Sequence, residues 1–462
     1  MSTSPHHIGP SHVSVPPPEC PAHAFGGGRT RLMESDVPPQ ELHEQLRDAH
    51  GSVVPVLLPG DLEAWLVVGY QEIQYVLRNT NQFSCDSRHW NAVKEGRLGP
   101  TNPLRPVTEY QPLIAFTDGQ EHARLRSAVT DGLERFNRQG IRRYVTRYTH
   151  QLVGNFAAAG RADLVADFAE PLPALVLGKQ FGVPAKQAIP LGWAVRDMVR
   201  GTDSALESNR FITQIMRELV REKRARPGHD FASWLLAHES GLSDVEAEEH
   251  LRHAMVAAVE NTVNLTANVL RVVLTDRRFR GNLAGGQMTL PDALDHVMWE
   301  APPLTLIPNR WATEPVFLGG RHIQSGDMVM LALAAGNRDP QVRPDLSVPM
   351  HGNRAHLAFG AGPHQCPGQD IGRTIADTGI DTLLASLPDI ELSVPEAELP
   401  VELSFISSPL GALPTTFRPR PTAQPRANDP RSPAPAPRAP GHPPSPAPRR
   451  RSWWAGLWGG RS

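Results

Sequence analysis

The chain has 462 residues, enough for one large domain or several smaller ones. Its 46 Lys and Arg residues nearly balance 48 Asp and Glu residues, which excludes the strongly basic surface of a dedicated nucleic-acid-binding protein. No apolar run approaches the ~20 residues that span a bilayer, and the N-terminus does not resemble a signal peptide. Three cysteines cannot all pair with one another, so we expect a protein of the reducing cytoplasm.

The first part of the chain predicts a short helix and a small β region. Residues 1–32 are rich in Pro, His and Ser, and we expect them to be mostly disordered. Apolar residues at i,i+4 predict a helix over 39–50. Residues 53–58 and 63–68 predict two strands joined by a Pro-Gly-Asp turn, and residues 71–78 predict a helix. The next thirty or so residues read as loop.

A third helix is expected to begin near residue 118. Asp118 followed by Glu121 predicts a capping box. His122 and Arg126 are spaced i,i+4 on the helix that follows, so both side chains project from one face and form a cationic clamp suited to carboxylates. The alternative is an ordinary solvated helix face. Arg124 points elsewhere and is expected at the surface.

Residues 244–275 contain no proline and predict a helix of roughly 45 Å, long enough to cross a whole domain. Small side chains, including Ala257, stand at its centre beside an acid, Glu260, and an amide, Asn261. This combination suits a buried site that handles protons, and the alternative is an ordinary polar patch on a buried helix.

A glycine-rich loop, residues 359–368, carries the most specific signal in the chain. Cys366 lies near its end, just before a predicted helix over 369–387, where helix N-terminal N–H groups are expected to lower the thiol pKa. Three glycines, among them Gly368, are expected to adopt positive φ, and the Phe359 ring is expected to pack beside the sulfur. Zinc does not fit, because no second cysteine stands at CxxC spacing. A catalytic cysteine with a distant histidine would leave the glycines unexplained.

This loop resembles the haem-binding signature Phe-x-x-Gly-x-x-x-Cys-x-Gly of the cytochrome P-450 family and matches it in full. The resemblance implies a mainly α fold with small β sheets, a triangular helical prism that holds haem b between the long helix and the cysteine loop. It implies Cys366 as the axial thiolate ligand of the iron. The resemblance also implies residues that contact the haem propionates, at the positions of His122, Arg126, Arg310 and His364. It implies two residues that manage protons, at the positions of Glu260 and Asn261.

Two positions depart from the family pattern. Asn261 stands where the family has a threonine, and an amide cannot donate a hydroxyl proton. The Glu-x-x-Arg motif is also missing, because one alignment frame gives His296 and Trp299 at its two ends and the other gives Asp295 and Met298. A subset of actinobacterial members lacks this motif, and the chain resembles that subset. We expect apolar packing by the bulky side chains to replace the ionic network.

The resemblance covers residues 33–418, which we expect to form the haem domain. Residues 419–462 are rich in Pro and Arg, end in a Trp cluster, and predict a disordered tail. The tail suggests a weak contact with a membrane surface or a protein, and the alternative is a low-complexity extension without a specific role.

The family implies a monooxygenase that draws electrons from NAD(P)H through an external ferredoxin and ferredoxin reductase and acts on a small organic molecule. Two rivals stay open. One is a haem-thiolate binding or regulatory protein, and the other is a peroxide-driven peroxygenase.

Overall fold

Helices dominate the computed structural model, as the sequence predicts. The structure describes residues 29–32, 35, 37–99, 102, 104–280, 288–348, 352–402, 404 and 406–420. Residues 1–28 of the predicted N-terminal segment and residues 421–462 of the predicted tail lie outside this part. Residues 29–32 were expected to be mostly disordered, but they contain a short strand, Thr30–Arg31, which pairs in parallel with Val56 and Leu57. The helices are α1 (Pro39–His50), α2 (Tyr70–Arg78), α3 (Asn91–Lys94), α4 (Arg105–Thr108), α5 (Gly119–Glu134), α6 (Arg138–Phe156), α7 (Pro171–Phe181), α8 (Ala185–Arg200), α9 (Ala205–Ala225), α10 (Phe231–Leu236), α11 (Asp244–Thr275), α12 (Arg277–Arg280), α13 (Leu290–Glu300), α14 (Leu333–Asn337) and α15 (Gln369–Ser386).

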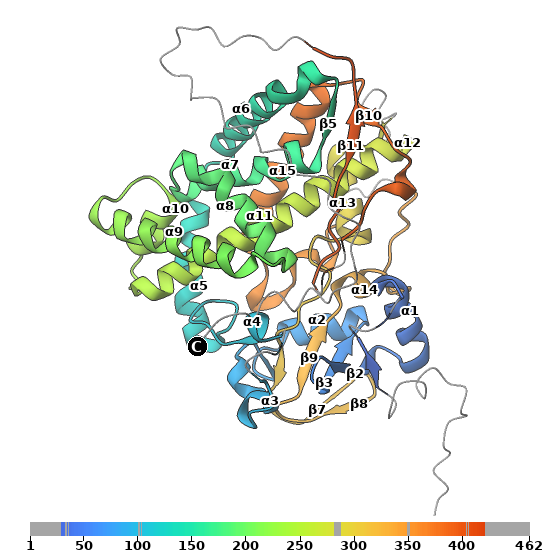
Figure 1. Ribbon diagram of the computed structural model, residues 1–462. Coiled ribbons are helices and arrows are strands. Elements are labelled where there is room, and N and C mark those ends of the chain that lie inside the picture. Colours follow the sequence, from blue (N-terminus) through green and yellow to red (C-terminus); the bar gives the residue numbers. More distant parts are fainter. Residues whose placement is uncertain are drawn as a thin grey trace, which may run out of the picture.

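The strands form one larger sheet and two small ones. They are β1 (Thr30–Arg31), β2 (Val53–Leu58), β3 (Leu62–Val67), β4 (Phe83–Ser84), β5 (Arg161–Asp163), β6 (Trp311–Ala312), β7 (Val316–Leu318), β8 (Arg321–Ile323), β9 (Met328–Leu331), β10 (Glu391–Leu392) and β11 (Pro414–Thr416). In the six-stranded sheet the order is β1-β2-β3-β9-β6-β4. The sheet lies beside α1 and α2 at the lower right of Figure 1, apart from most of the helices.

The predicted β2–β3 hairpin is confirmed, with β3 beginning and ending one residue earlier than expected. Only the tertiary structure adds β9, which pairs with β3 in parallel with Ala64 opposite Met328. All four residues of β9 are buried, which is typical of a central strand covered on both faces.

The long helix α11 has the predicted bounds and runs through the middle of the molecule (Figure 1). It begins at a capping box in which Ser243 and Glu246 satisfy each other's backbone N–H groups. It packs against α7, α8, α9, α13 and α15, so most of its side chains are buried. Its length, 32 residues, corresponds to about 48 Å.

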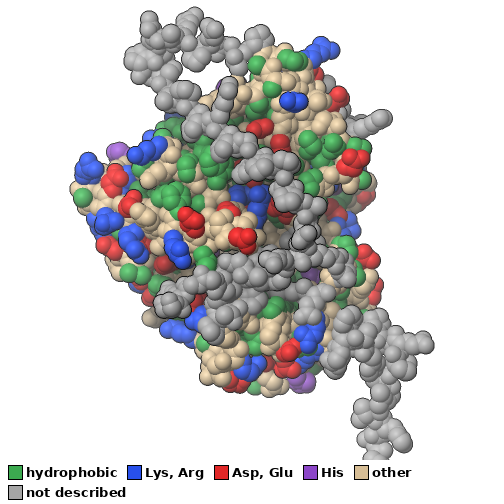
Figure 2. Space-filling view, viewed as in Figure 1, with side chains coloured by type: hydrophobic (Ala, Val, Ile, Leu, Met, Phe, Trp, Pro, Cys, Tyr) green, Lys and Arg blue, Asp and Glu red, His purple; other side chains and the backbone are tan. Residues whose placement is uncertain are grey.

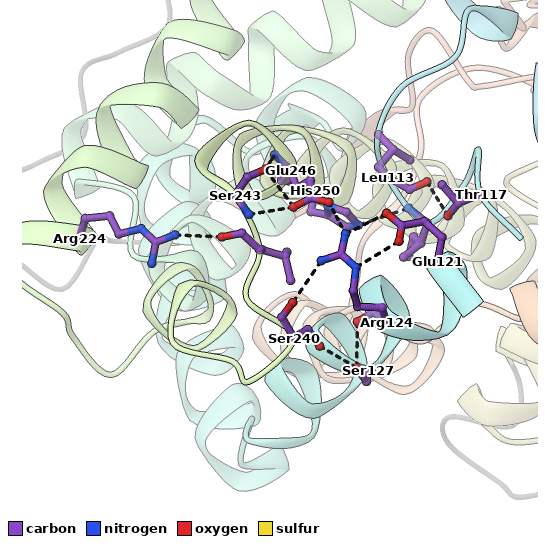
Figure 3. Close-up of polar contacts among 12 residues, drawn as sticks. Leu113, Thr117, Glu121, Arg124, Ser127, Arg224, Ser240, Ser243, Glu246 and His250 are labelled. Atoms are coloured by element: carbon purple, nitrogen blue, oxygen red, sulfur yellow. Dashed lines mark hydrogen bonds and ion pairs between the residues drawn. The ribbon is translucent and has the colours of Figure 1, made fainter. Parts of the chain in front are cut away.

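A polar network joins the first turn of α11 to α5 and to the loop that precedes α5 (Figure 3). Arg124 is 33% exposed, in agreement with the expected surface position, and it forms ion pairs with Glu121 and Glu246. The Nδ1 atom of His250 lies 2.6 Å from the Glu246 carbonyl oxygen, and its Nε2 accepts the Ile114 N–H at 3.2 Å. These two contacts fix a neutral imidazole that carries its proton on Nδ1.

Charges of both signs are intermixed over the face of the molecule that Figure 2 shows. Among the described residues, no helix combines the length and apolar content needed to cross a bilayer.

Candidate active site

Cys366 lies in a tight loop directly before α15, as the sequence predicts. Its backbone N–H donates to the Phe359 carbonyl at 2.9 Å, and the Gln365 N–H donates to the Gly362 carbonyl at 3.0 Å. These bonds close the loop on itself and leave the half-buried cysteine three residues before the first residue of α15, Gln369.

Two of the three glycines in the loop adopt the positive φ that favours glycine, and the third does not. Gly360 and Gly362 have φ values of +66° and +68°. A Cβ on Gly362 would lie 2.5 Å from the Leu77 carbonyl oxygen of α2, so the loop approaches that helix too closely for any side chain. Gly368 has φ −97° with open space around it, so the expectation of a positive φ is wrong there. The chain has already turned into α15 at this residue.

Burial raises the pKa of the Cys366 thiol, which contradicts the expected lowering. The Gly368 N–H and the Arg126 charge act in the opposite direction but do not overcome the loss of water. The expectation counted the helix N-terminus and not the desolvation. A thiol of this kind loses its proton when it coordinates a metal ion, because the bound cation is the largest local charge.

The residues with predicted propionate roles meet at the cysteine loop. His122 is buried on α5, and its ring stacks on the ring of His364 with centroids 4.1 Å apart. Arg126, one turn further along α5, donates from Nη2 to the Gln365 carbonyl at 2.5 Å. Arg310 is buried directly before β6.

Two buried polar atoms in this group have no hydrogen-bond partner among the described residues. They are His122 Nε2 and Arg310 Nε. Because a buried donor without a partner costs about 1–3 kcal/mol, the site fits an additional acceptor such as a carboxylate. The donors present therefore fit the two propionates of a haem beside the cysteine.

Asp118 positions His364, and the predicted capping box at α5 is wrong. The Asp118 side chain caps no N–H of α5. Instead its Oδ1 lies 3.0 Å from His364 Nε2, and its Oδ2 accepts from the Ser84 hydroxyl and the Cys85 N–H, both at 2.7 Å. The Cys85 sulfur is 3.3 Å from the same His364 nitrogen. Sequence reasoning missed Asp118 and Cys85, because no spacing rule links residues so far apart in the chain.

Half-buried residues form a stripe along α11, which is otherwise mostly buried at this level. Between residues 252 and 261 they are residues 252–254, 256–258 and 261, which recur every three to four positions. The Asn261 Nδ2 donates to the Ala257 carbonyl at 2.9 Å, so the amide is held against its own helix.

Glu260 points to a different partner. Both of its carboxylate oxygens lie 3.1 Å from Nη1 of Arg196, which comes from α8, and Glu260 and Arg196 are both buried. Asn264 bonds to both members of the pair. Arg196 Nε also lies 3.1 Å from Glu170. The structure therefore does not bring the Glu260 and Asn261 side chains together.

An ion pair persists where the Glu-x-x-Arg motif is missing. Asp295 of α13 lies 2.6 Å from the guanidinium of Arg373 on α15, and both side chains are buried. This supports the alignment frame of Asp295 and Met298, and it corrects the expectation of purely apolar replacement. The arginine comes from another helix, which a motif search on one helix cannot find. Trp299 is buried nearby and donates from Nε1 to the Asn353 carbonyl at 3.2 Å.

Comparisons with known proteins point to one family. No family model matches the chain. The chain is 33% identical over 347 residues to cytochrome P450-SU2 of Streptomyces griseolus, which covers 73% of this chain and 83% of that protein. It is 29% identical over 349 residues to the mycinamicin IV hydroxylase/epoxidase of Micromonospora griseorubida, covering 73% of this chain and 85% of that one. It is 28% identical over 385 residues to the 2-hydroxy-5-methyl-1-naphthoate 7-hydroxylase of Streptomyces carzinostaticus. This match covers 81% of this chain and 94% of that protein.

Among solved structures, the chain is similar to CYP154A1 of Streptomyces coelicolor A3(2), with a TM-score of 0.75, 26% identity, and coverage of 84% of this chain and 100% of that one. The shared fold, and an identity to a bacterial relative that extends over most of both chains, show that this protein belongs to the cytochrome P450 family of haem-thiolate monooxygenases.

Proposed function

We propose that this monooxygenase inserts one oxygen atom of dioxygen into a small organic molecule of the secondary-metabolite class. The proposal rests on two buried polar atoms next to the Cys366 loop, His122 Nε2 and Arg310 Nε, which have no partner among the described residues, because the propionates of a bound cofactor would supply the missing partners. By their names, two hydroxylases to which the chain is similar act on mycinamicin IV and on 2-hydroxy-5-methyl-1-naphthoate, which supports a small organic substrate.

The residues present fit haem b, iron protoporphyrin IX, within the haem domain of residues 33–418. In this proposal Cys366 ligates the iron, Phe359 and Gly368 flank the ligand loop, and four side chains hold the propionates, which are His122, Arg126, Arg310 and His364. When bound, haem supplies the iron at which dioxygen is activated. Asp118 fixes the orientation of the His364 ring through the 3.0 Å contact at Nε2.

Glu260 and Asn261 are the residues that we propose handle protons. Since Asn261 Nδ2 is already bonded to Ala257, its Oδ1 is the atom available to accept a hydrogen bond from water. The Glu260 carboxylate is paired with the buried Arg196 guanidinium, so it can contact a water at the site only when that ion pair opens. This arrangement predicts slow proton delivery compared with a hydroxyl side chain at the Asn261 position.

We further propose that electrons reach the site from NAD(P)H through an external ferredoxin and ferredoxin reductase, in the cytoplasm. Both cysteines in the described part of the chain, Cys85 and Cys366, are free thiols, which is compatible with a reducing compartment.

The rival function is that of a haem-thiolate binding or regulatory protein. It is favoured by the hydrogen bond of the Asn261 amide to Ala257 and by the ion pair of Glu260 with Arg196. A peroxygenase is a second rival and would act with peroxide in the absence of a reductase.

The test has two parts. The reduced, CO-bound difference spectrum of the wild-type protein is expected to show the thiolate-ligated Soret maximum, and Cys366→Ser is expected to lose it. Cys20→Ser is the matched cysteine control and should keep it. Product formation with NAD(P)H and surrogate redox partners then separates an enzyme from a binding protein, and complete uncoupling to peroxide with every substrate tried would favour the rival.

A further inference from the structure

A cavity of about 310 Å³ lies behind the cysteine loop. Its walls are α2, the loop residues 359–362 and 365, the segment 354–356, and the first two turns of α15. This volume is at the lower end of the range of small-ligand sites, roughly 300–1,000 Å³. Four of the side chains that line the cavity are not among the proposed haem contacts. They are Arg78, Arg354, Arg373 and His356.

The lining is positively charged. Arg78 comes from α2, Arg354 from the segment before the cysteine loop, and Arg373 from α15. No acidic side chain stands among the described residues that line the cavity. Arg78 and Arg354 are exposed at its mouth, whereas Arg373 is buried at its inner end. Three guanidinium groups without an acid in the same wall attract an anion.

The inner end also contains polar atoms without partners. His356 is 6% exposed, and neither of its ring nitrogens has a hydrogen-bond partner in the described part of the chain. Arg373 is 8% exposed, and although one guanidinium nitrogen pairs with Asp295 at 2.6 Å, its Nη1 atom has no partner there. Gln74 contributes one unpartnered acceptor, Oε1, while its Nε2 donates to the Tyr70 hydroxyl at 3.1 Å.

We propose that this cavity binds a small oxyanion, such as inorganic phosphate or a short carboxylate. Arg373 Nη1 and one N–H of a neutral His356 donate to it from the inside, and Arg78 and Arg354 close over it at the mouth. Gln74 Oε1 accepts from a protonated oxygen of the anion or from a water beside it. Charge-assisted bonds of this kind are short and roughly twice as strong as neutral ones. The four donors named here are not among the proposed haem contacts, although Phe359 of the cysteine loop also lines the cavity, so the inference goes beyond the proposed function.

The neutral state of His356 suits this arrangement. Burial lowers the pKa of His356 to about 4, with the Arg373 charge acting in the same direction. The ring therefore offers one donor and one acceptor at neutral pH. An anion between Arg373 and His356 would accept a hydrogen bond from the single N–H of the neutral ring, while the Arg373 guanidinium supplies the positive charge.

The experiment titrates the purified, haem-containing full chain with inorganic phosphate at constant ionic strength, and follows heat by calorimetry and the thermal midpoint of unfolding. Wild-type protein is expected to show saturable binding and a rise in midpoint that follows ligand concentration. Arg78→Gln and Arg354→Gln change exposed side chains, so they are expected to fold, and each should weaken phosphate binding at least fivefold. Arg210→Gln, an exposed arginine on α9, removes the same charge elsewhere and should leave the dissociation constant unchanged.

A parallel titration with acetate tests whether a carboxylate is accepted. Absence of saturable phosphate and acetate binding would mean that the cavity holds water only and would overturn the proposal. Equal weakening in the Arg210→Gln control would reduce the effect to non-specific charge attraction and would also overturn it. Because binding is read from heat and unfolding, a failure here is distinguishable from absent monooxygenase activity.

Discussion

Replacing Gly362 by alanine is the sharpest test of the cysteine-loop geometry. The residue has φ +68°, and an L-residue in this left-handed region costs about 1–2 kcal/mol. The new Cβ would also lie 2.5 Å from the Leu77 carbonyl oxygen and 3.0 Å from the Arg78 Cα. These are backbone atoms of α2 and cannot rotate away, so overpacking adds about 1–3 kcal/mol. We expect Gly362→Ala to lose about 2–5 kcal/mol of unfolding free energy.

Two neighbouring glycines are matched controls. Gly360 has φ +66°, but the nearest atom to an added Cβ is 4.0 Å away, so Gly360→Ala should lose only about 1–2 kcal/mol. Gly368 has φ −97° and open space, so Gly368→Ala should change the stability by less than about 1 kcal/mol. The predicted order of destabilisation is Gly362, then Gly360, then Gly368.

The assay is urea unfolding of the three variants followed by circular dichroism, together with the haem content of each purified protein. The unfolding midpoint reports stability if the urea slope is unchanged. Haem content should follow the same order, because α2 and the cysteine loop must stay in contact for Cys366 to keep its place. If Gly362→Ala proved as stable as Gly368→Ala, the close approach of the loop to α2 would be refuted.

Three further outcomes follow from buried charges. Arg196→Leu leaves the buried Glu260 carboxylate without its partner and should lower the unfolding free energy, measured in urea, by about 3–5 kcal/mol. Adding Glu260→Leu should recover part of the loss, and a double variant no more stable than the single one would contradict this. Asp295→Asn removes the counter-ion of buried Arg373 and should lower both the thermal midpoint and haem retention, and an unchanged midpoint would show that the pair is not needed. Burial lowers the pKa of His43 to about 4, below its unfolded value of 6.5, so its stabilising effect is complete above pH 6.5 and is lost as the pH falls toward 4, by on the order of 3 kcal/mol. Unfolding measured against pH should therefore show a steeper acid loss for wild type than for His43→Gln, and identical profiles would argue against a buried neutral histidine.

The sequence by itself determined the parts of this protein that depend on local chemistry. The helix at residues 39–50 and the long helix at 244–275 have the predicted bounds, because their apolar spacing is local and the long helix also begins at a capping box. The β2–β3 hairpin follows from its turn residues in the same way. The cysteine loop was identifiable because one short stretch contains the sulfur, the glycines and the start of a helix.

Only the tertiary structure decided how distant residues meet. Asp295 and Arg373 form an ion pair between two helices, and Asp118 contacts His364 and does not cap α5 as expected. Contacts between remote segments produce no periodic pattern in a sequence, so neither could be predicted. The pKa of the Cys366 thiol also depends on the tertiary structure. Local sequence shows the helix N-terminus that favours a thiolate, but burial by the rest of the fold raises the pKa, and desolvation is the larger effect.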